Sequence, residues 1–383
     1  MKILLKGYYG FGNLGDDILM CTIYKVVKNR YPTAQFFIFS NYDTDLKGFN
    51  RQPDYNKYIH KLFGEQLTII NWTYRGEFDL VFDGGGGVYF DSQKRSKIRT
   101  LLNESLIRIG ANHVYRFDKF IRWITGRKRH IRFKRRMGFG IGIGPYSRSS
   151  IMLYRHLVEI GSTDVLFVRD KTSLEFLNLI NYVGVKGLCA DVAFLWAAGL
   201  EKPVRAKPKE PIDKIGIILL DWPDGDDSRF SEFQKFADKQ IDVGKSVTFF
   251  SFDENADKRY SSIFESKYNY EVWRPNDMTL NEFLATLSLQ DILFSARAHG
   301  VIIGAIYGVP SVCIVVSPKL LEISKMIPLG TSIIGDHPTV AILEEELSKA
   351  NLTYGEMLNG LRQNVLANVK LGLTSWELFS KEL

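Results

Sequence analysis

The chain of 383 residues is poor in cysteine and has neither a long uninterrupted hydrophobic run nor a Cys-x-x-Cys pair. Its three cysteines lie far apart, which argues against a disulfide framework and a zinc site. The longest apolar stretch, 301–316, contains Gly304, Gly308 and Pro310 and is shorter than the ~20 residues of a membrane span. The N-terminus lacks a signal-peptide pattern. These absences predict a cytoplasmic globular protein with no metal site.

What the sequence does have is the composition of a well-cored protein, with 45% apolar and 13% aromatic residues. Strand and helix signals alternate, as in parallel α/β sheets. We expect strands at Lys2–Lys6, Gln35–Phe39, Asp79–Phe82, Met137–Ile143, Asp164–Val168, Val185–Cys189, Lys214–Leu220, Ser246–Phe250, Tyr270–Trp273, Asp291–Phe294 and Val312–Val316.

A charged segment with three prolines, 201–211, divides the chain and predicts a linker. The fold class expected is α/β, with two Rossmann-like doubly wound domains facing a cleft. The first domain would span 1–200 and the second 212–335, followed by C-terminal helices over 336–383. The cleft between the domains is the expected site.

The segment from Ser295 to Gly300 is the most informative part of the sequence. It places Arg297 and His299 between an apolar strand and a helix of small residues, where α/β proteins bind ligands. The first amides of the helix favour an anion, and an arginine can fork onto carboxylate or phosphate. An anionic substrate is the prediction; a buried Arg/His pair with a purely structural role is the alternative.

The glycines Gly10, Gly12 and Gly15 follow the first strand in a G-x-G-x-x-G pattern. Asp16 and Asp17 come directly after, and two carboxylates at the helix start would repel a pyrophosphate. We therefore expect Asn13 with Asp16 or Asp17 to face a neutral, hydroxyl-rich ligand. A tight turn with capping carboxylates is the alternative.

Other strand ends are also rich in glycine or charge. Four glycines follow Asp83, including Gly85 and Gly86, and more fill 138–144, where a backbone could approach a ligand closely. Arg169 and Asp191 each end an apolar run.

The net charge of +7 is concentrated in one segment. Nine lysines and arginines and no acidic residue lie between Lys119 and Arg136, and without them the net charge is −2. Apolar residues at Phe117, Phe120, Ile121 and Ile124 have helical spacing. We expect a basic amphipathic insert, 115–136, that docks on an anionic membrane surface; a solvated basic loop is the alternative. No nucleic-acid motif accompanies it.

The ordered set of motifs resembles the polysaccharide pyruvyl transferases. It comprises 7–17, 83–87, 142–145, 168–173, 190–194, 295–305, Gly308-Val-Pro310 and Ser317-Pro-Lys319. The resemblance implies a GT-B-like fold and transfer of pyruvate from phosphoenolpyruvate onto two hydroxyls of a sugar, which forms a ketal and releases phosphate. It implies no cofactor and no metal, and an acceptor in a cell-surface polysaccharide or its lipid-linked precursor. The basic insert 115–136 further predicts that the acceptor sugar is carried on a polyprenyl phosphate at the cytoplasmic face of the membrane.

This chemistry assigns roles to the candidate residues. Arg169, Arg297 and Lys319, with Ser295 and Gly300, would bind the donor. His299 would move the proton, with Arg297 and Asp191 as further catalytic groups. The acceptor side would comprise Asn13, Asp16, Asp17, Gly85 and Gly86.

Two other functions remain open at this point. A GT-B glycosyltransferase would share the fold and the cleft but use a nucleotide-sugar donor. A non-enzymatic partner-binding protein would have no need of Arg169, Arg297 and His299 together at strand ends.

Overall fold

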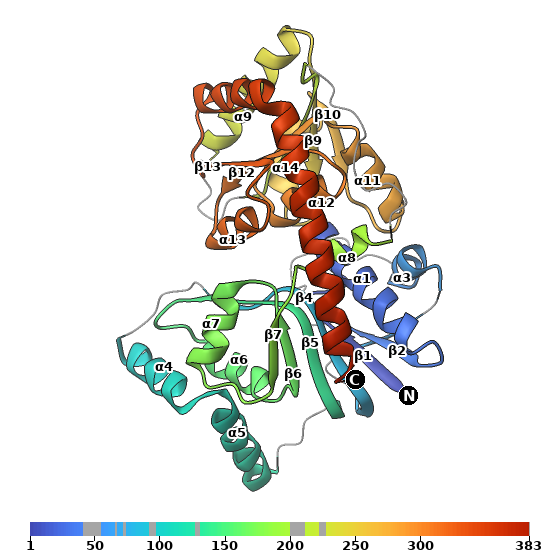
Figure 1. The fold of residues 1–383 in the computed structure, drawn as a ribbon, viewed down its shortest axis with the longest axis vertical. Coiled ribbons are helices and arrows are strands. Elements are labelled where there is room, and N and C mark those ends of the chain that lie inside the picture. Colours follow the sequence, from blue (N-terminus) through green and yellow to red (C-terminus); the bar gives the residue numbers. More distant parts are fainter. Residues whose placement is uncertain are drawn as a thin grey trace.

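The computed structural model describes residues 1–40, 55–65, 67–71, 74–91, 97–126, 131–199, 211–221 and 227–382. These residues form two parallel sheets, each flanked by helices (Figure 1). The predicted α/β class with two Rossmann-like, doubly wound parallel sheets is confirmed. Of the predicted linker 201–211, only Pro211 is among the described residues.

The first sheet has seven strands in the order β3-β2-β1-β4-β5-β6-β7. Its strands are β1 (Lys2–Lys6), β2 (Gln35–Phe39), β3 (Thr68–Ile70), β4 (Gly76–Asp91), β5 (Ile131–Tyr146), β6 (Val165–Val168) and β7 (Val185–Leu188). Its helices are α1 (Leu14–Arg30), α3 (Tyr55–Phe63), α4 (Lys97–Ile109), α5 (Ala111–Thr125), α6 (Leu153–Ile160), α7 (Lys171–Leu179) and α8 (Ala193–Ala197). Strands such as β6 are buried along their whole length, which explains why they read as continuous apolar runs.

The second sheet has six strands in the order β10-β9-β8-β11-β12-β13. Its strands are β8 (Lys214–Ile218), β9 (Ser246–Ser251), β10 (Asn269–Val272), β11 (Ile292–Ser295), β12 (Ser311–Val315) and β13 (Thr331–Gly335). Its helices are α9 (Ser228–Asp242), α10 (Lys258–Phe264), α11 (Leu280–Ser288), α12 (Ala298–Ile306) and α13 (Pro318–Met326).

The strand order of each sheet reverses at one place, between β1 and β4 in the first sheet and between β8 and β11 in the second. Ligands of open α/β sheets bind beyond the carboxyl ends of the strands at such switch points. The loops after β1, β8 and β11 are therefore the expected walls of a site.

Element α14 (Val340–Ser380) consists of two helices that meet at a kink, and it passes from the second sheet to the first (Figure 1). It departs from helical geometry at Thr353, where φ is −113° and ψ is 15°. Near its end, Phe379 is fully buried and packs against Phe82 and Phe139 of the first sheet. The residues predicted as C-terminal helices thus contribute to the core of the N-terminal half.

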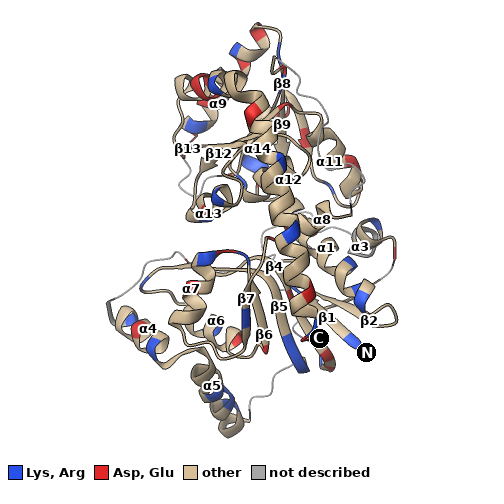
Figure 2. Cartoon of the chain, in the orientation of Figure 1, with Lys and Arg blue, Asp and Glu red and all other residues tan. Residues whose placement is uncertain are grey.

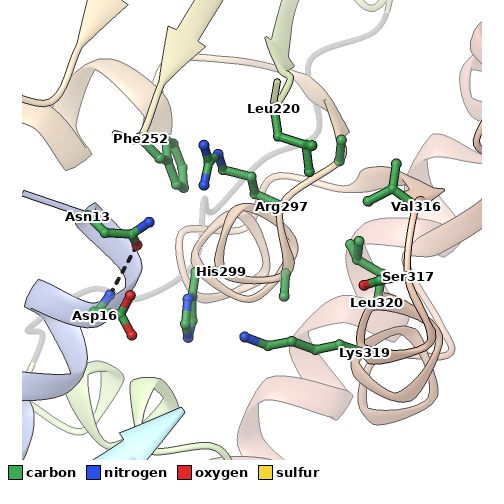
Figure 3. Close-up of a pocket in the computed structure, with 12 residues that line it drawn as sticks. Asn13, Asp16, Leu220, Phe252, Arg297, His299, Val316, Ser317, Lys319 and Leu320 are labelled. Carbon is green, nitrogen blue, oxygen red and sulfur yellow. Dashed lines mark hydrogen bonds between the residues drawn. The ribbon is translucent and has the colours of Figure 1, made fainter. Parts of the chain in front are cut away.

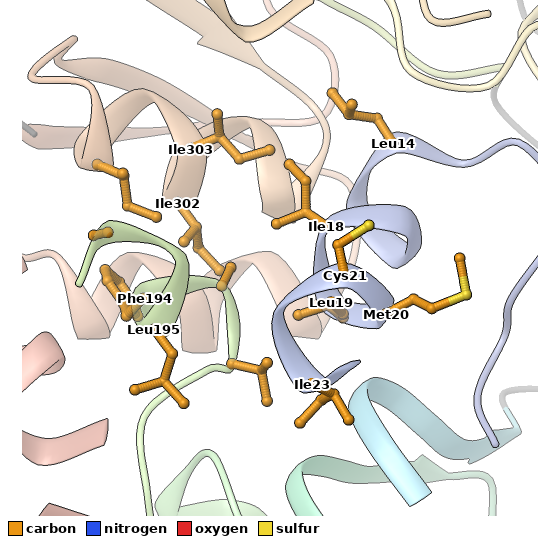
Figure 4. Packing of buried hydrophobic residues seen from close by; sticks show 14 of the residues in the cluster. Leu14, Ile18, Leu19, Met20, Cys21, Ile23, Phe194, Leu195, Ile302 and Ile303 are labelled. Carbon is orange, nitrogen blue, oxygen red and sulfur yellow. The ribbon is translucent and has the colours of Figure 1, made fainter. Parts of the chain in front are cut away.

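One hydrophobic cluster runs across both halves of the molecule. It contains Leu14 and Ile18 of α1, Phe194 of α8 and Ile302 and Ile303 of α12 (Figure 4). Two hydrogen bonds reinforce this junction: the Leu14 amide donates to the Phe252 carbonyl at 2.9 Å, and the Trp273 indole donates to the Asp17 carboxylate at 2.7 Å. The starts of α1 and α12 are therefore held against each other.

Candidate active site

A cavity of about 190 Å³ opens where the two switch points meet (Figure 3). Its walls come from the start of α1 on one side and from the loops after β8, β9, β11 and β12 on the other. The lining residues are Asn13, Asp16, Leu220, Phe252, Ala296, Arg297, Ala298, His299, Val316, Ser317, Lys319 and Leu320. Five of them, Asn13, Asp16, Arg297, His299 and Lys319, are predicted site residues.

His299 lies in the first turn of α12 and is 7% exposed. Its Nε2 atom is buried and has no hydrogen-bond partner among the described residues. Burial lowers the pKa of His299 from 6.5 to about 3; the charge of Asp191 raises it, and the charges of Lys319 and Arg169 lower it further. The imidazole is therefore neutral near pH 7 in the free protein.

Arg169 follows β6 and is almost completely buried, at 5% exposure. Its Nη1 atom donates to the Asp191 carboxylate at 2.7 Å, while its Nε has no hydrogen-bond partner among the described residues. Asp191 is fully buried and also accepts from the Ala193 amide at 3.0 Å. Although burial acts to raise it, the Arg169 and His299 charges leave the pKa of Asp191 below its ordinary value.

Lys319 and Asp16 face the cavity from opposite sides (Figure 3). Burial lowers the pKa of Lys319 to about 8, assisted by the Arg169 charge. Burial also raises the pKa of Asp16 to about 7, against the opposing charge of Lys319. Asp16 is therefore able to take up or release a proton near neutral pH.

Glycines make room for three of these side chains. A Cβ on Gly15 would overlap the His299 ring, and one on Gly142 would lie 2.9 Å from the Arg169 guanidinium. A Cβ on Gly87 would lie 3.3 Å from Lys319 Nζ. These three glycines thus allow a polar side chain to approach the backbone, in two of the three cases from the other half of the molecule.

Arg297 is held by groups that the sequence did not single out. Its guanidinium forms an ion pair with buried Asp257 and donates to the Leu219 carbonyl at 3.3 Å. Asp257 also accepts from the Ser251 hydroxyl at 3.0 Å. The Arg297 side chain retains 17% exposure toward the cavity.

Ser295 and Gly300 shape the turn that presents Arg297 and His299. The Ser295 hydroxyl donates to the Arg297 carbonyl at 2.8 Å and accepts from the Arg297 amide at 3.2 Å. The Gly300 amide donates to the Arg297 carbonyl at 3.0 Å, and a Cβ on Gly300 would collide with the Ser295 hydroxyl. Neither residue lines the cavity.

The predicted acceptor residues do not all reach the cavity. Asn13 lines it, caps α1 through the Gly15 and Asp16 amides, and donates to Asp253 at 3.4 Å. Asp17 is instead fully buried against Trp273. Gly85 and Gly86 have positive φ values of 26° and 90°, and a Cβ on either would press against Leu19 of α1.

Sequence reasoning missed Asp253, Asp257 and Phe252 as neighbours of the site. One signal was available, since Phe252 and Asp253 directly follow the apolar strand β9, as Arg297 and Lys319 follow theirs. The contact of Asp257 with Arg297 depends on how α10 packs, which no local pattern reports.

The segment Lys119–Arg136 does not form one basic insert. Lys119 and Arg122 belong to α5, Arg127, Lys128 and Arg129 lie outside the described residues, and the remaining four basic residues belong to β5. The prediction of a basic insert that docks on a membrane is wrong for 131–136, because these residues belong to β5. Arg136 is buried in the sheet and forms two hydrogen bonds with Asp83, at 2.6 and 3.0 Å.

Within the described residues, no group of three or more His, Cys, Asp or Glu side chains is placed to hold a metal ion. No helix among these residues has the length and apolar content to cross a membrane.

Comparison with known proteins gives one family and one fold. Residues 13–318 match the sequence profile of the polysaccharide pyruvyl transferases. No similar sequence was found among curated proteins.

Solved structures with a similar fold include UDP-N-acetylglucosamine 2-epimerases. A putative one from Listeria monocytogenes has 11% identity and a TM-score of 0.54, over 95% of this chain and 90% of the other. That of Neisseria meningitidis has 10% identity and a TM-score of 0.54 over 100% of both chains. That of Methanocaldococcus jannaschii has 11% identity and a TM-score of 0.52 over 99% of both chains. At such identities the likeness concerns the fold alone.

Proposed function

The chain belongs to the polysaccharide pyruvyl transferase family, and we propose that it transfers pyruvate from phosphoenolpyruvate onto two hydroxyls of a sugar. The product is a pyruvate ketal on a cell-surface polysaccharide or on its polyprenyl-phosphate-linked precursor, and phosphate is released. The observation that carries the proposal is the meeting of Arg297, His299 and Lys319 around one cavity at the junction of the two sheets. Arg169 does not line this cavity, but its charge lowers the pKa of both His299 and Lys319.

The charges of this cluster fit the donor. Asp191 and Asp257 pair with Arg169 and Arg297, whereas Lys319 has no ion pair among the described residues. Burial is the main cause of the lowered pKa values of His299 and Lys319, and the charges of Arg169 and Arg297 lower both pKa values further. A bound anion would offset this local excess of positive charge. Phosphoenolpyruvate supplies a phosphate and a carboxylate, both suited to arginine and lysine.

The reaction balances with these residues. A proton added to C3 of the donor generates oxocarbenium-like charge at C2, and the first sugar hydroxyl attacks C2 and loses its proton. Cleavage of the C2–O bond then expels phosphate, and the second hydroxyl attacks and also loses its proton. The two hydroxyls together release two protons. One balances the proton added to C3, and the other leaves with the phosphate.

Each proton transfer has a candidate acid or base near the cavity. His299, once protonated in the presence of the donor's negative charge, is the acid for C3. Asp16 lines the cavity and has a pKa of about 7, so it is the candidate base for the acceptor hydroxyls. Asp191 acts instead through Arg169 and His299, because it is fully buried and paired.

The proposal is tested by thermal unfolding of the purified protein with either phosphoenolpyruvate or a panel of nucleotide sugars. We expect phosphoenolpyruvate to raise the melting temperature, since a ligand that binds only the folded state stabilises it. Stabilisation by nucleotide sugars alone would favour a glycosyltransferase and overturn the proposal. Phosphate release from phosphoenolpyruvate, measured with a panel of acceptor glycans, then identifies the acceptor class.

A further inference from the structure

Helix α5 has an outer face of large apolar side chains turned to solvent. The face consists of Phe117, Phe120, Ile121, Trp123 and Ile124, which are 58%, 53%, 40%, 78% and 60% exposed. None of them belongs to the buried clusters of the described residues. Contiguous exposed apolar surface of this kind marks an interaction site on a folded protein.

The opposite face of α5 is fixed, so the exposure does not reflect a poorly packed helix. Ala111, Val114 and Asp118 are buried. The Asp118 carboxylate accepts from Arg122 at 2.6 Å and from the Tyr154 hydroxyl at 3.3 Å. The outer face is consequently held outward on a rigid support, at the end of the first sheet away from the second (Figure 1).

The charges around this face are mostly positive. Arg108 at the end of α4 and Arg116 and Lys119 on α5 are exposed, and Figure 2 shows basic residues along α5. In α4 and α5 the only acidic residue besides buried Asp118 is Glu104. A second copy of the chain would bring like charges together, whereas an anionic surface would neutralise them.

We propose that the outer face of α5 docks the protein on an anionic lipid surface, parallel to the membrane plane. Its aromatic and aliphatic side chains would enter the region between headgroups and acyl chains, where tryptophan is favoured. Arg116 and Lys119 lie on one flank of the apolar stripe, within reach of lipid phosphates. This inference does not depend on the proposed function and uses none of the cavity residues.

The test is flotation of the full chain with lipid vesicles. We expect binding to vesicles of phosphatidylcholine and phosphatidylglycerol in equal parts, and binding at least about tenfold weaker to phosphatidylcholine alone. High salt should weaken the binding to the anionic vesicles, because exposed charges are screened. Failure to bind anionic vesicles, or equal binding to both kinds, would overturn the proposal.

Matched variants assign the binding to α5. Phe120→Ser with Trp123→Ser should weaken it about tenfold or more, whereas Leu352→Ser with Leu366→Ser, exposed leucines of α14, should not change it. Arg116→Glu with Lys119→Glu should also weaken binding about tenfold or more, unlike Arg362→Glu with Lys370→Glu on α14. If the α5 and α14 variants bind equally, the proposal is wrong.

Sedimentation without lipid tests whether a second copy of the chain, rather than a lipid surface, covers the outer face of α5. The proposal requires that the wild type and the Phe120→Ser, Trp123→Ser variant sediment alike. Self-association that this variant abolishes would assign the outer face of α5 to a second copy of the chain and overturn the lipid proposal.

Discussion

Two buried arginines on neighbouring strands of the first sheet differ in how fully they are paired. Arg136 of β5 is 4% exposed and bonds to Asp83, Glu159, Ser162 and Tyr89. Arg169, just after β6, is 5% exposed, yet its Nε has no hydrogen-bond partner among the described residues. The two arginines are equally buried, but only one is fully satisfied by the fold.

The difference follows the direction of the strands. Arg136 lies before the buried centre of β5, whereas Arg169 lies at the carboxyl end of β6, the edge where ligands bind in such sheets. The Arg169 Nε lies 3.6 Å from the Asp170 carboxylate, too far for a hydrogen bond. A buried donor without a hydrogen bond carries a desolvation cost, which a bound anion would relieve. We therefore propose that Arg136 stabilises the fold and that Arg169 binds the donor anion.

Replacement of Arg136 should have the largest effect, and it should act on stability. Arg136→Met leaves buried Asp83 without its partner and removes one partner of Glu159, which keeps Lys6. We expect the free energy of unfolding to fall by about 3–5 kcal/mol. Urea unfolding measures this free energy. The control is Lys134→Met on the same strand, where the pair with Asp79 is exposed and the loss should be much smaller. Equal losses in both variants would contradict the structural role of Arg136.

Replacement of Arg169 should act mainly on activity. For Arg169→Met we expect kcat/KM for phosphate release from phosphoenolpyruvate to fall about 10²–10³-fold, as on removal of one charge-stabilising group. Its stability should also fall, because fully buried Asp191 loses its ion-pair partner, but less than in Arg136→Met, which loses hydrogen bonds to four side chains. Full activity of Arg169→Met, or a larger loss of stability in this variant than in Arg136→Met, would contradict the proposed difference between the two arginines.

A smaller effect should follow from crowding Arg169 without removing it. The Cβ of Gly142→Ala would lie 2.9 Å from the guanidinium, and the resulting displacement should lower kcat/KM about 10- to 100-fold. Gly355→Ala is the control, since nothing lies near its Cβ position, and it should keep wild-type activity. Unchanged kinetics in Gly142→Ala would show that the position of Arg169 is unimportant.

The smallest expected signal is a change in bound protons. Donor anions beside His299, Lys319 and Asp16 stabilise the protonated forms and raise all three pKa values, so donor binding near pH 7 should take up protons, up to about one per donor at His299. Calorimetric titration in buffers of different ionisation enthalpy measures the uptake. His299→Asn should reduce it, and net proton release in the wild type would contradict the account.

The fold could be predicted where burial leaves a continuous apolar run. The predicted limits of β1 and β2 match the structure, and those of β6 differ by one residue. The short strand β3 and the partly exposed strand β13 gave no comparable signal. At the start of β5, Ile131 and Phe133 alternate with charged residues, a strand pattern that the abundance of arginine and lysine concealed.

The arginine, histidine and lysine side chains of the candidate site could be predicted from the sequence, but most of their partners could not. Arg169, Arg297, His299 and Lys319 follow strands or begin helices, and topology brings such ends together. Asp257 contacts Arg297, and Trp273 contacts Asp17, only because elements distant in the sequence pack together. The role of Gly15 is likewise visible only once His299 lies against it.

Carbon-13 NMR of reactions containing phosphoenolpyruvate labelled at C2, with an acceptor glycan panel, tests the central claim most directly. The account predicts that the labelled carbon becomes a ketal carbon bonded to two sugar oxygens while phosphate appears, and that Arg169→Met forms this product far more slowly. Unaltered phosphoenolpyruvate with every acceptor, together with consumption of a nucleotide sugar by the same protein, would contradict it.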